Sequence, residues 1–407
     1  MSVLAGFSLP TTLIAQSAPR QPNVVIIVAD DLGYGDLSCY GAHRIQTPGM
    51  DRIANEGIRF TQGYCTAATS TPSRYSLLTG LYPWTNRDAK ILPGNAALII
   101  NTQQVTLPKV MKQAGYVTGS VGKWHLGLGD GVVDWNQLVY PGAKEIGYDY
   151  SFIQAATNDR VPCIFIENGR GVNLDPNERF AGKSGMGPRG DVILEADWCV
   201  TEFLKEMDKL GLTENTLVVF TSDNGPVLDD GYQDQAVELV GDHKMAGPLR
   251  GGKTSLYDGG TCIPFMLRWP AEVKPGAVSD ALVCQMDLLA SLSALIGQTY
   301  SDKVDSQNTL PVFLGKGGNG RKELVLEGYF NYALRDGDWV MIPPYPDTYG
   351  DAEEAAFAGN SNCYQLYNVK EDIGQQVNLA EKEPKRLRQM MMTFERLKRE
   401  TGKITNF

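Results

Sequence analysis

Residues 23–31 read NVVIIVADD, and they give the clearest indication of the fold class. The run Asn23–Ala29 is apolar and rich in β-branched residues, which is typical of a strand covered on both faces. The pattern recurs at residues 217–225, LVVFTSDNG, after an amphipathic helix expected from Val192 to Leu210. Helices that alternate with buried strands predict an α/β fold with a mostly parallel central sheet and helices on both faces.

The pattern of apolar and polar residues changes near residue 321. Residues 323–342 alternate between apolar and polar side chains with turns between them, and a charged helix is expected from Glu381 to Glu400. We therefore divide the chain into a probable leader at residues 1–20, a catalytic domain at 21–320 and a C-terminal α+β subdomain with an antiparallel sheet at 321–407.

The N-terminal residues resemble a secretory signal, although they lack its basic start. Residues 1–16 are mostly apolar, and the first positive charge is Arg20. Later in the chain, no apolar run approaches the ~20 residues of a membrane-spanning helix. We expect a protein without a membrane span that is periplasmic or secreted.

Composition excludes two classes of function. The 407 residues carry 37 basic and 47 acidic side chains, a net charge of −10, which disfavours binding to a nucleic-acid backbone. The chain has three histidines, at positions 43, 125 and 243, so a two-zinc centre with several histidine ligands is nearly excluded.

Oxygen-bearing side chains follow two of the expected strands. Asp30 and Asp31 end the first, and Asp223 and Asn224 end the second. Such loop residues often serve only as turn formers. Because ligands gather at the carboxyl ends of strands in open α/β sheets, we expect these four to form a site for a hard divalent cation such as Ca²⁺. Asp36 is a weaker candidate.

Residues 70–80, STPSRYSLLTG, place a serine and an arginine at the start of an expected helix, which suits an anion. This segment resembles the signature of the type I sulfatases, members of the alkaline phosphatase superfamily. Five further motifs occur in the order typical of that family: ADDLGYGD, GKWHLG, TSDNGP, LRGGK and YNVKED. The resemblance extends from Asn23 to beyond Asn378.

The resemblance implies a reaction and a set of site residues. A sulfatase-maturating enzyme would oxidise Ser70 to formylglycine, and the serine form of the signature points to bacteria. Calcium would be held by residue 70 together with Asp30, Asp31, Asp223 and Asn224. The formylglycine and the sulfate would be surrounded by Arg74, Lys123, His125 and Lys253.

The chemistry explains these residue types. A hydrated aldehyde offers one hydroxyl to attack sulfur, forming a sulfo-enzyme intermediate. Deprotonation of its second hydroxyl, for which His125 is suited, then expels sulfate. The cations would neutralise sulfate oxygens. Taken singly, Lys123 and Lys253 could be surface lysines, and His125 could be a packed core residue.

One feature departs from the family pattern. Sulfatases commonly carry a further histidine between the GKWH and DNG segments, whereas this chain has none between His125 and His243. Asn158, Asp159 or Arg160 could line the site instead, and Arg160 could equally form a surface salt bridge. His243 is our candidate for the leaving-group acid. His43 is a subsite residue or a structural one.

We therefore expect hydrolysis of an O-sulfate ester on a carbohydrate, with galactose or N-acetylgalactosamine preferred. Three alternatives remain: an arylsulfatase acting on small aryl sulfates, a phosphatase or phosphodiesterase that uses unmodified Ser70, and a noncatalytic binder of sulfated glycans. The mass of the peptide that contains Ser70 would separate the sulfatase from the phosphatase.

Overall fold

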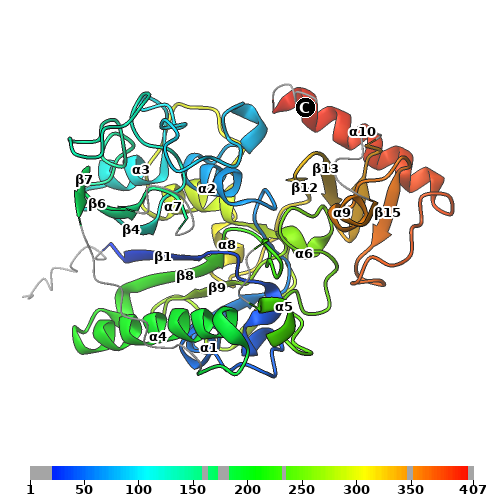
Figure 1. Cartoon of the computed structure of the whole chain (residues 1–407), viewed down its shortest axis with the longest axis horizontal. Helices are drawn as coiled ribbons and strands as arrows, with labels where there is room; N and C mark the ends of the chain where they lie inside the picture. Colours follow the sequence, from blue (N-terminus) through cyan, green and yellow to red (C-terminus); the bar gives the residue numbers. More distant parts are fainter. Residues whose placement is uncertain (1–20, 158–163, 173–182, 232–234, 346–351, 402–407) are drawn as a thin grey trace, which may run out of the picture.

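The computed structural model describes residues 21–157, 164–172, 183–231, 235–345 and 352–401 (Figure 1). Its central sheet has five strands in the order β1-β8-β9-β2-β10. Their bounds are β1 Asn23–Ala29, β8 Thr216–Ser222, β9 Phe265–Arg268, β2 Ile58–Phe60 and β10 Ala277–Ser279. Four strands run in one direction and β9 runs against them, so the predicted mostly parallel sheet is confirmed.

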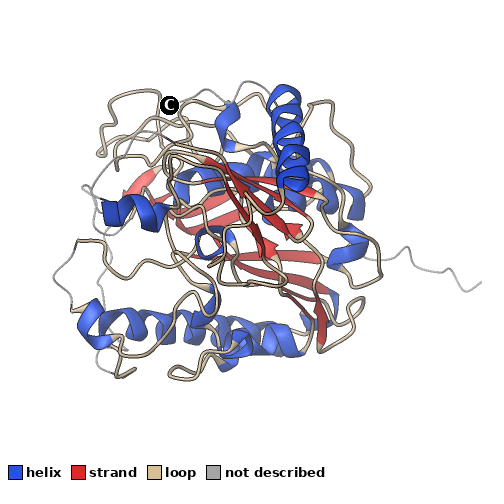
Figure 2. Cartoon of the chain, turned by 90° about the vertical axis from the view of Figure 1, so that its right-hand side faces the viewer, coloured by secondary structure: helices blue, strands red, loops and turns tan. Residues whose placement is uncertain are grey.

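Helices cover both faces of this sheet, with the strands between them in Figure 2. One face carries α1 (Pro48–Asn55) and α4 (Gly187–Lys209), and the other carries α2 (Ser70–Thr79), α3 (Leu107–Gln113) and α7 (Leu288–Leu295). Strand β8 explains why both layers are needed. Val218 and Phe220 point into the first cluster of core side chains, while Leu217 and Val219 point into the second.

The C-terminal region forms the predicted antiparallel sheet. Its strands are β12 (Glu323–Glu327), β13 (Tyr332–Asp336), β14 (Trp339–Ile342) and β15 (Gln365–Asn368), and α10 (Pro384–Glu400) packs beside them. The helix begins three residues later than expected, at a proline whose fixed φ suits the first turn.

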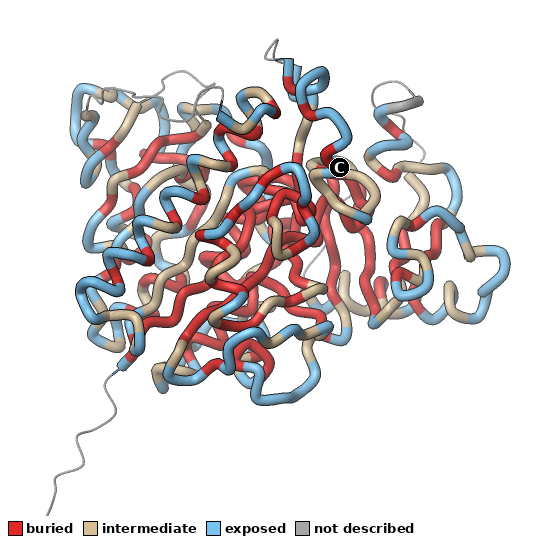
Figure 3. Tube along the Cα trace, turned by 90° about the horizontal axis from the view of Figure 1, so that it is seen from below, coloured by how far each residue is buried: buried red, intermediate tan, exposed pale blue. Residues whose placement is uncertain are grey.

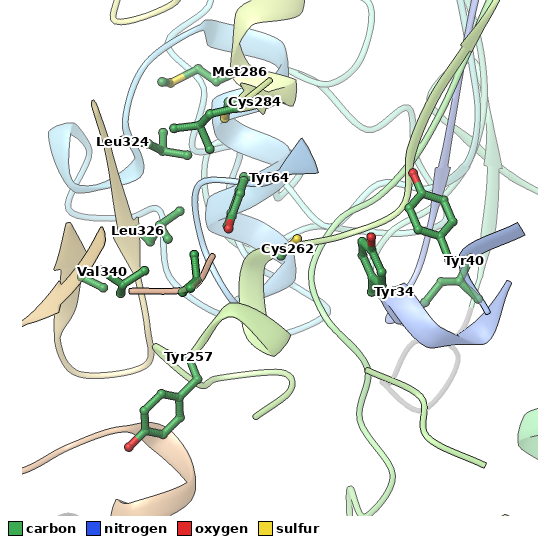
Figure 4. Close-up of a cluster of buried hydrophobic side chains, with 14 of the residues drawn as sticks. Tyr34, Tyr40, Tyr64, Tyr257, Cys262, Cys284, Met286, Leu324, Leu326 and Val340 are labelled. Atoms are coloured by element: carbon green, nitrogen blue, oxygen red, sulfur yellow. The ribbon is translucent and has the colours of Figure 1, made fainter. Parts of the chain in front are cut away.

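This sheet shares one hydrophobic core with the main body. Figure 4 shows Leu324, Leu326 and Val340 of the C-terminal sheet in the same cluster as Tyr64 and Cys284 of the main body. In Figure 3 the buried trace likewise runs through the middle of the molecule, with exposed segments around it.

A second four-stranded sheet lies beside β1. It contains β4 (Gly119–Lys123), β5 (Tyr150–Gln154), β6 (Phe165–Glu167) and β7 (Arg170–Val172). Within the described chain, β1 pairs only with β8 and β4 only with β5. Side chains bridge the two strands at both ends: Tyr116 bonds the Pro22 carbonyl at 2.8 Å, and Lys123 bonds Asp30. A cavity of about 490 Å³ lies between them, lined by both strands and by α2 and α3.

The remaining elements are short. They are β3 (Gly63–Tyr64), β11 (Val283–Cys284), α5 (Ala236–Leu239), α6 (Asp258–Thr261), α8 (Leu310–Phe313) and α9 (Ala352–Ala358). Across the described ranges, every helix is too short or too polar to cross a bilayer.

Candidate active site

The candidate site forms where three strands end and one helix begins. Asp30 follows β1, Asp223 follows β8, and Lys123 is the last residue of β4. Ser70 is the first residue of α2. The parallel direction of β1 and β8 brings their carboxyl ends to the same edge of the sheet, so residues almost 200 positions apart meet there.

Ser70 lies at the centre of this group and is buried, with 4% of its surface exposed. Its hydroxyl donates to Oδ2 of Asp223 at 2.7 Å and accepts from Nε of Arg74 at 3.0 Å. Nδ1 of His125 lies 3.3 Å from the same oxygen. Thr71, the next residue, bonds the His125 carbonyl at 3.0 Å, which ties α2 to the loop after β4.

Three carboxylates gather beside Ser70. Oxygens of Asp30, Asp31 and Asp223 all lie within 4.8 Å of one another, close enough to share one metal ion. Asn224 donates through Nδ2 to Asp31 at 2.7 Å, while its buried Oδ1 has no hydrogen-bond partner in the part of the chain that the structure describes. This amide oxygen is therefore a fourth potential ligand.

Three cations face these carboxylates. Nη2 of Arg74 lies 2.9 Å from Asp223 and 3.6 Å from Asp30. Lys123 bonds Asp30 and lies 3.8 Å from Asp223, and Lys253 bonds Asp31 at 2.6 Å. Three negative and three positive side chains thus form one cluster in a protein whose net charge is −10; Asp30 is exposed, and the other five are buried or half-buried.

The charges shift the pKa values of the group in opposite directions. Burial, and then the neighbouring Asp223 carboxylate, raise the pKa of Asp30 to about 6. Burial also opposes ionisation of Asp223, but Arg74 and Lys123 outweigh it and hold its pKa below the ordinary value. Burial of Lys253 is likewise outweighed, by Asp31, so that its pKa is raised. The cluster therefore favours an ionised Asp223.

The backbone is strained at three points of the site. Asp31, His125 and Thr254 adopt positive φ angles of 52°, 54° and 74°. Residues other than glycine seldom adopt this conformation, and such strain is concentrated at functional sites. Each of the three is in the site or next to one of its cations.

The other residues predicted for the site do not lie beside Ser70 in the described structure. His243 is buried, and its Nε2 lies 2.8 Å from Oδ1 of Asp36 rather than beside Ser70. His43 is exposed and lies 3.7 Å from Asp242. Asn158, Asp159 and Arg160 lie outside the described residues.

Sequence reasoning did not single out Arg189. This residue stands in the first turn of α4, and its Nη2 donates to Oδ2 of Asp36 at 2.6 Å. The sequence gives only a weak signal for it, an arginine just after the proline that starts a helix.

Comparison with known proteins agrees with this geometry. The family model described as Sulfatase matches residues 22–162 and 147–298. An N-acetylgalactosamine-6-O-sulfatase of Bacteroides thetaiotaomicron is 39% identical, over 93% of this chain and 93% of its own length. Human N-acetylgalactosamine-6-sulfatase is 32% identical, over 74% of this chain and 67% of its own length.

Solved structures also resemble the chain. A sulfatase structure from work on glycosaminoglycan metabolism by Bacteroides thetaiotaomicron has a TM-score of 0.89 and 39% identity, covering 93% of this chain and 99% of that one. A structure in complex with a neocarrahexaose, 22% identical and covering 95% of each chain, shares the fold with a TM-score of 0.76.

The alignment with the 39%-identical relative contains positions that have no counterpart in this chain. Its alignment runs over 478 positions, whereas 93% of the 407 residues is about 379. About 100 aligned positions (478 − 379) therefore have no residue of this chain.

The signature at Ser70, the cluster around it and these matches lead to one conclusion. The chain belongs to the sulfatase family and is a sulfuric ester hydrolase.

Proposed function

We propose that this enzyme removes O-sulfate groups from carbohydrates, with 6-sulfated N-acetylgalactosamine as the preferred substrate class and galactose sulfates next. The main support is the arrangement around Ser70, whose hydroxyl contacts Asp223, Arg74 and His125. The names of the bacterial and human relatives at 39% and 32% identity support the choice of sugar.

The residues present fit a divalent cation, and we propose Ca²⁺. The donors are all oxygens, from Asp30, Asp31, Asp223 and Asn224, and Ca²⁺ prefers such ligands. The buried Oδ1 of Asn224 has no hydrogen-bond partner among the described residues, which fits a metal ligand better than a turn residue. Residue 70 would complete the set. When bound, the cation would act as a Lewis acid toward the oxygen at residue 70.

Charge balance indicates what such a site attracts. Three carboxylates and three cations sum to zero (3 − 3 = 0), so a bound divalent cation would leave the cluster with a charge of +2. A sulfate monoester carries one negative charge. We infer that Arg74, Lys123 and Lys253 bind its oxygens, because pre-placed cations stabilise charge that develops on the transferring group and the leaving oxygen.

His125 is the proposed proton carrier. Its Nδ1 faces the oxygen of residue 70, and its Nε2 lies 3.0 Å from the Leu92 carbonyl, which fixes the orientation of the ring. A histidine so placed can accept a proton from residue 70 near neutral pH. We retain Arg160 and Asn158 as proposed contacts to the sugar.

We further propose that Ser70 is converted to formylglycine by a maturating enzyme, and that the protein acts in the periplasm or outside a bacterial cell. The family membership and the serine form of the signature support the conversion. Formylglycine supplies a hydrated aldehyde in place of a simple hydroxyl. The apolar start of the sequence supports export.

Sulfate release from defined substrates tests this proposal. The panel contains N-acetylgalactosamine 6-sulfate, the 4-sulfate, galactose 6-sulfate, an aryl sulfate and an aryl phosphate. We expect the highest kcat/KM on N-acetylgalactosamine 6-sulfate, and no release by Ser70→Ala. A higher value on the aryl sulfate would favour the arylsulfatase, one on the aryl phosphate would favour the phosphatase, and binding without turnover would favour the glycan binder.

Ser76→Ala is the matched control. Ser76 lies in the same helix and is buried, but its hydroxyl has no hydrogen-bond partner within the described ranges. The same chemical change there should leave turnover close to that of the unaltered enzyme. Equal turnover by Ser70→Ala and Ser76→Ala would contradict the role given to Ser70.

A further inference from the structure

Asp36 is a buried carboxylate outside the group around Ser70, and it has three donors. Its Oδ2 accepts from the Gly33 amide at 2.7 Å and from Nη2 of Arg189 at 2.6 Å. Its Oδ1 lies 2.8 Å from Nε2 of His243. The side chains of Asp36 and His243 are 0% and 1% exposed, so solvent does not compete for these contacts.

Arg189 links this carboxylate to both loops that carry the proposed metal ligands. Its Nη1 donates to the Val227 carbonyl at 2.9 Å, three residues after Asn224. Its Nη2 also lies 3.5 Å from the Asp31 carbonyl. One planar guanidinium, whose donors have a fixed geometry, thus spans the loop after β1 and the loop after β8.

The segment that carries His243 packs against the loop after β1. The Gly35 amide donates to the Met245 carbonyl at 2.6 Å. A Cβ on Gly33 would lie 2.3 Å from that carbonyl oxygen, and one on Gly35 would lie 2.2 Å from the Lys244 carbonyl oxygen. Only glycine allows the two backbones to approach so closely. The same segment continues to Lys253, which bonds Asp31.

We propose that Arg189, Asp36 and His243 are positioning residues that hold the two ligand loops at the separation a divalent cation needs. The inference rests on the proposed metal site. Asp30, Asp31 and Asp223 repel one another when ionised, so their loops need a restraint that does not consume their own oxygens. Arg189 bonds carbonyl oxygens and Asp36 instead. His243 thereby acquires a role other than the leaving-group acid, since its Nε2 is held by Asp36.

Calcium affinity tests this role without relying on turnover. Isothermal titration of the full chain with Ca²⁺ should give a dissociation constant about 10- to 100-fold higher for Arg189→Gln than for the unaltered protein, as is typical when groups that orient metal ligands are removed. Arg189→Lys, which keeps the charge but loses the planar fork, should fall between them.

Arg44→Gln is the matched control. Arg44 pairs with Asp242 at 3.1 Å and bonds the Val240 carbonyl, next to His243 but outside the network. It should leave the calcium affinity within about twofold. An Arg189→Gln affinity equal to that of Arg44→Gln would overturn the inference.

Unfolding temperatures separate positioning from a general loss of stability. A purely structural role would lower the unfolding temperature equally in EDTA and in excess Ca²⁺. The positioning role predicts a smaller calcium-induced rise for Arg189→Gln, because weaker binding stabilises less at the same ion concentration. If Arg189→Gln does not fold, His243→Gln replaces it, and an unchanged calcium affinity in that variant would equally overturn the inference.

The titration also separates this inference from the proposal on which it rests. If the unaltered protein does not bind Ca²⁺, the proposed metal site is wrong and the positioning role fails with it. If the unaltered protein binds Ca²⁺ and the network variants bind it equally well, only the positioning role is wrong.

Discussion

Because of Glu327, we expect the free energy of unfolding to depend on pH in an unusual way. It ends β12, is 7% exposed, and its Oε2 has no hydrogen-bond partner within the described residues. Burial raises the pKa of this carboxyl from 4.5 to about 8. Its backbone bonds Thr66 and Ala68, just before Ser70, so the residue supports the segment that leads into the site.

The sign follows from proton binding. Between pH 4.5 and about 8 the folded protein holds the Glu327 proton more firmly than the unfolded chain does. The contribution of this group to stability is therefore fully present below pH 4.5 and is lost as the pH rises toward 8. At about 1.4 kcal/mol per pH unit, we expect a loss of about 3 to 4 kcal/mol between pH 5 and pH 8.

Urea unfolding of Glu327→Gln at both pH values tests this magnitude. The amide cannot ionise, and the penalty for burying it is the same at pH 5 and pH 8, so it cancels in the comparison. Relative to the unaltered protein, the variant should gain about 3 to 4 kcal/mol on going from pH 5 to pH 8.

Glu323→Gln, at the other end of β12, is the control. Glu323 forms an ion pair with the half-exposed Arg396, so this change should shift the free energy of unfolding by only about 0 to 1 kcal/mol. The reasoning is refuted if the Glu327→Gln difference between the two pH values is below about 1 kcal/mol, because a buried carboxyl with this pKa must produce more.

Three further predictions concern the core and the site. Arg321 forms a buried bidentate pair with Asp287, at 2.6 and 2.7 Å. Arg321→Leu should lower the free energy of unfolding, measured by urea titration, by about 3 to 5 kcal/mol, and a change below about 1 kcal/mol would contradict this. Asn224→Ala removes the buried Oδ1, which has no hydrogen-bond partner among the described residues, and should weaken calcium binding measured by calorimetry. An unchanged affinity would exclude this oxygen as a ligand. His125→Ala should lower kcat about 10²- to 10⁴-fold in a sulfate-release assay and should remove one limb of the dependence of kcat on pH. A loss of only a few fold would rule out proton transfer by this ring.

The meeting of the proposed metal ligands was predictable because it follows from strand direction. Asp30 comes directly after the apolar run of β1 and Asp223 directly after the buried strand β8, and parallel neighbouring strands place such ends together. Lys123 does not follow this rule, because β4 lies in another sheet, and it was expected only from the family resemblance. The meeting of Ser70 with these groups was expected from the family resemblance, and the structure shows the contact itself.

The position of His243 was less accessible from sequence. It precedes Lys253 by ten residues, and proximity along the chain suggested a shared site. The intervening loop turns through Gly247 and Gly251, with φ angles of 62° and 80°, and carries Lys253 to Asp31 while His243 meets Asp36. Loop paths of this kind depend on tertiary contacts and leave no periodic signal in the sequence.

The sequence likewise does not show that β1 and β4 belong to different sheets. Strand pairing depends on register and on the neighbours available, neither of which composition specifies.

The mass of one peptide shows whether Ser70 becomes formylglycine. Trypsin releases Phe60–Arg74, which contains both Ser70 and Ser73, from protein co-produced with a maturating enzyme that acts on serine-type sulfatases. We predict a peptide lighter by two hydrogens, with fragmentation placing the loss at Ser70 and leaving Ser73 intact. A peptide with the mass of unmodified serine would contradict the formylglycine-dependent account.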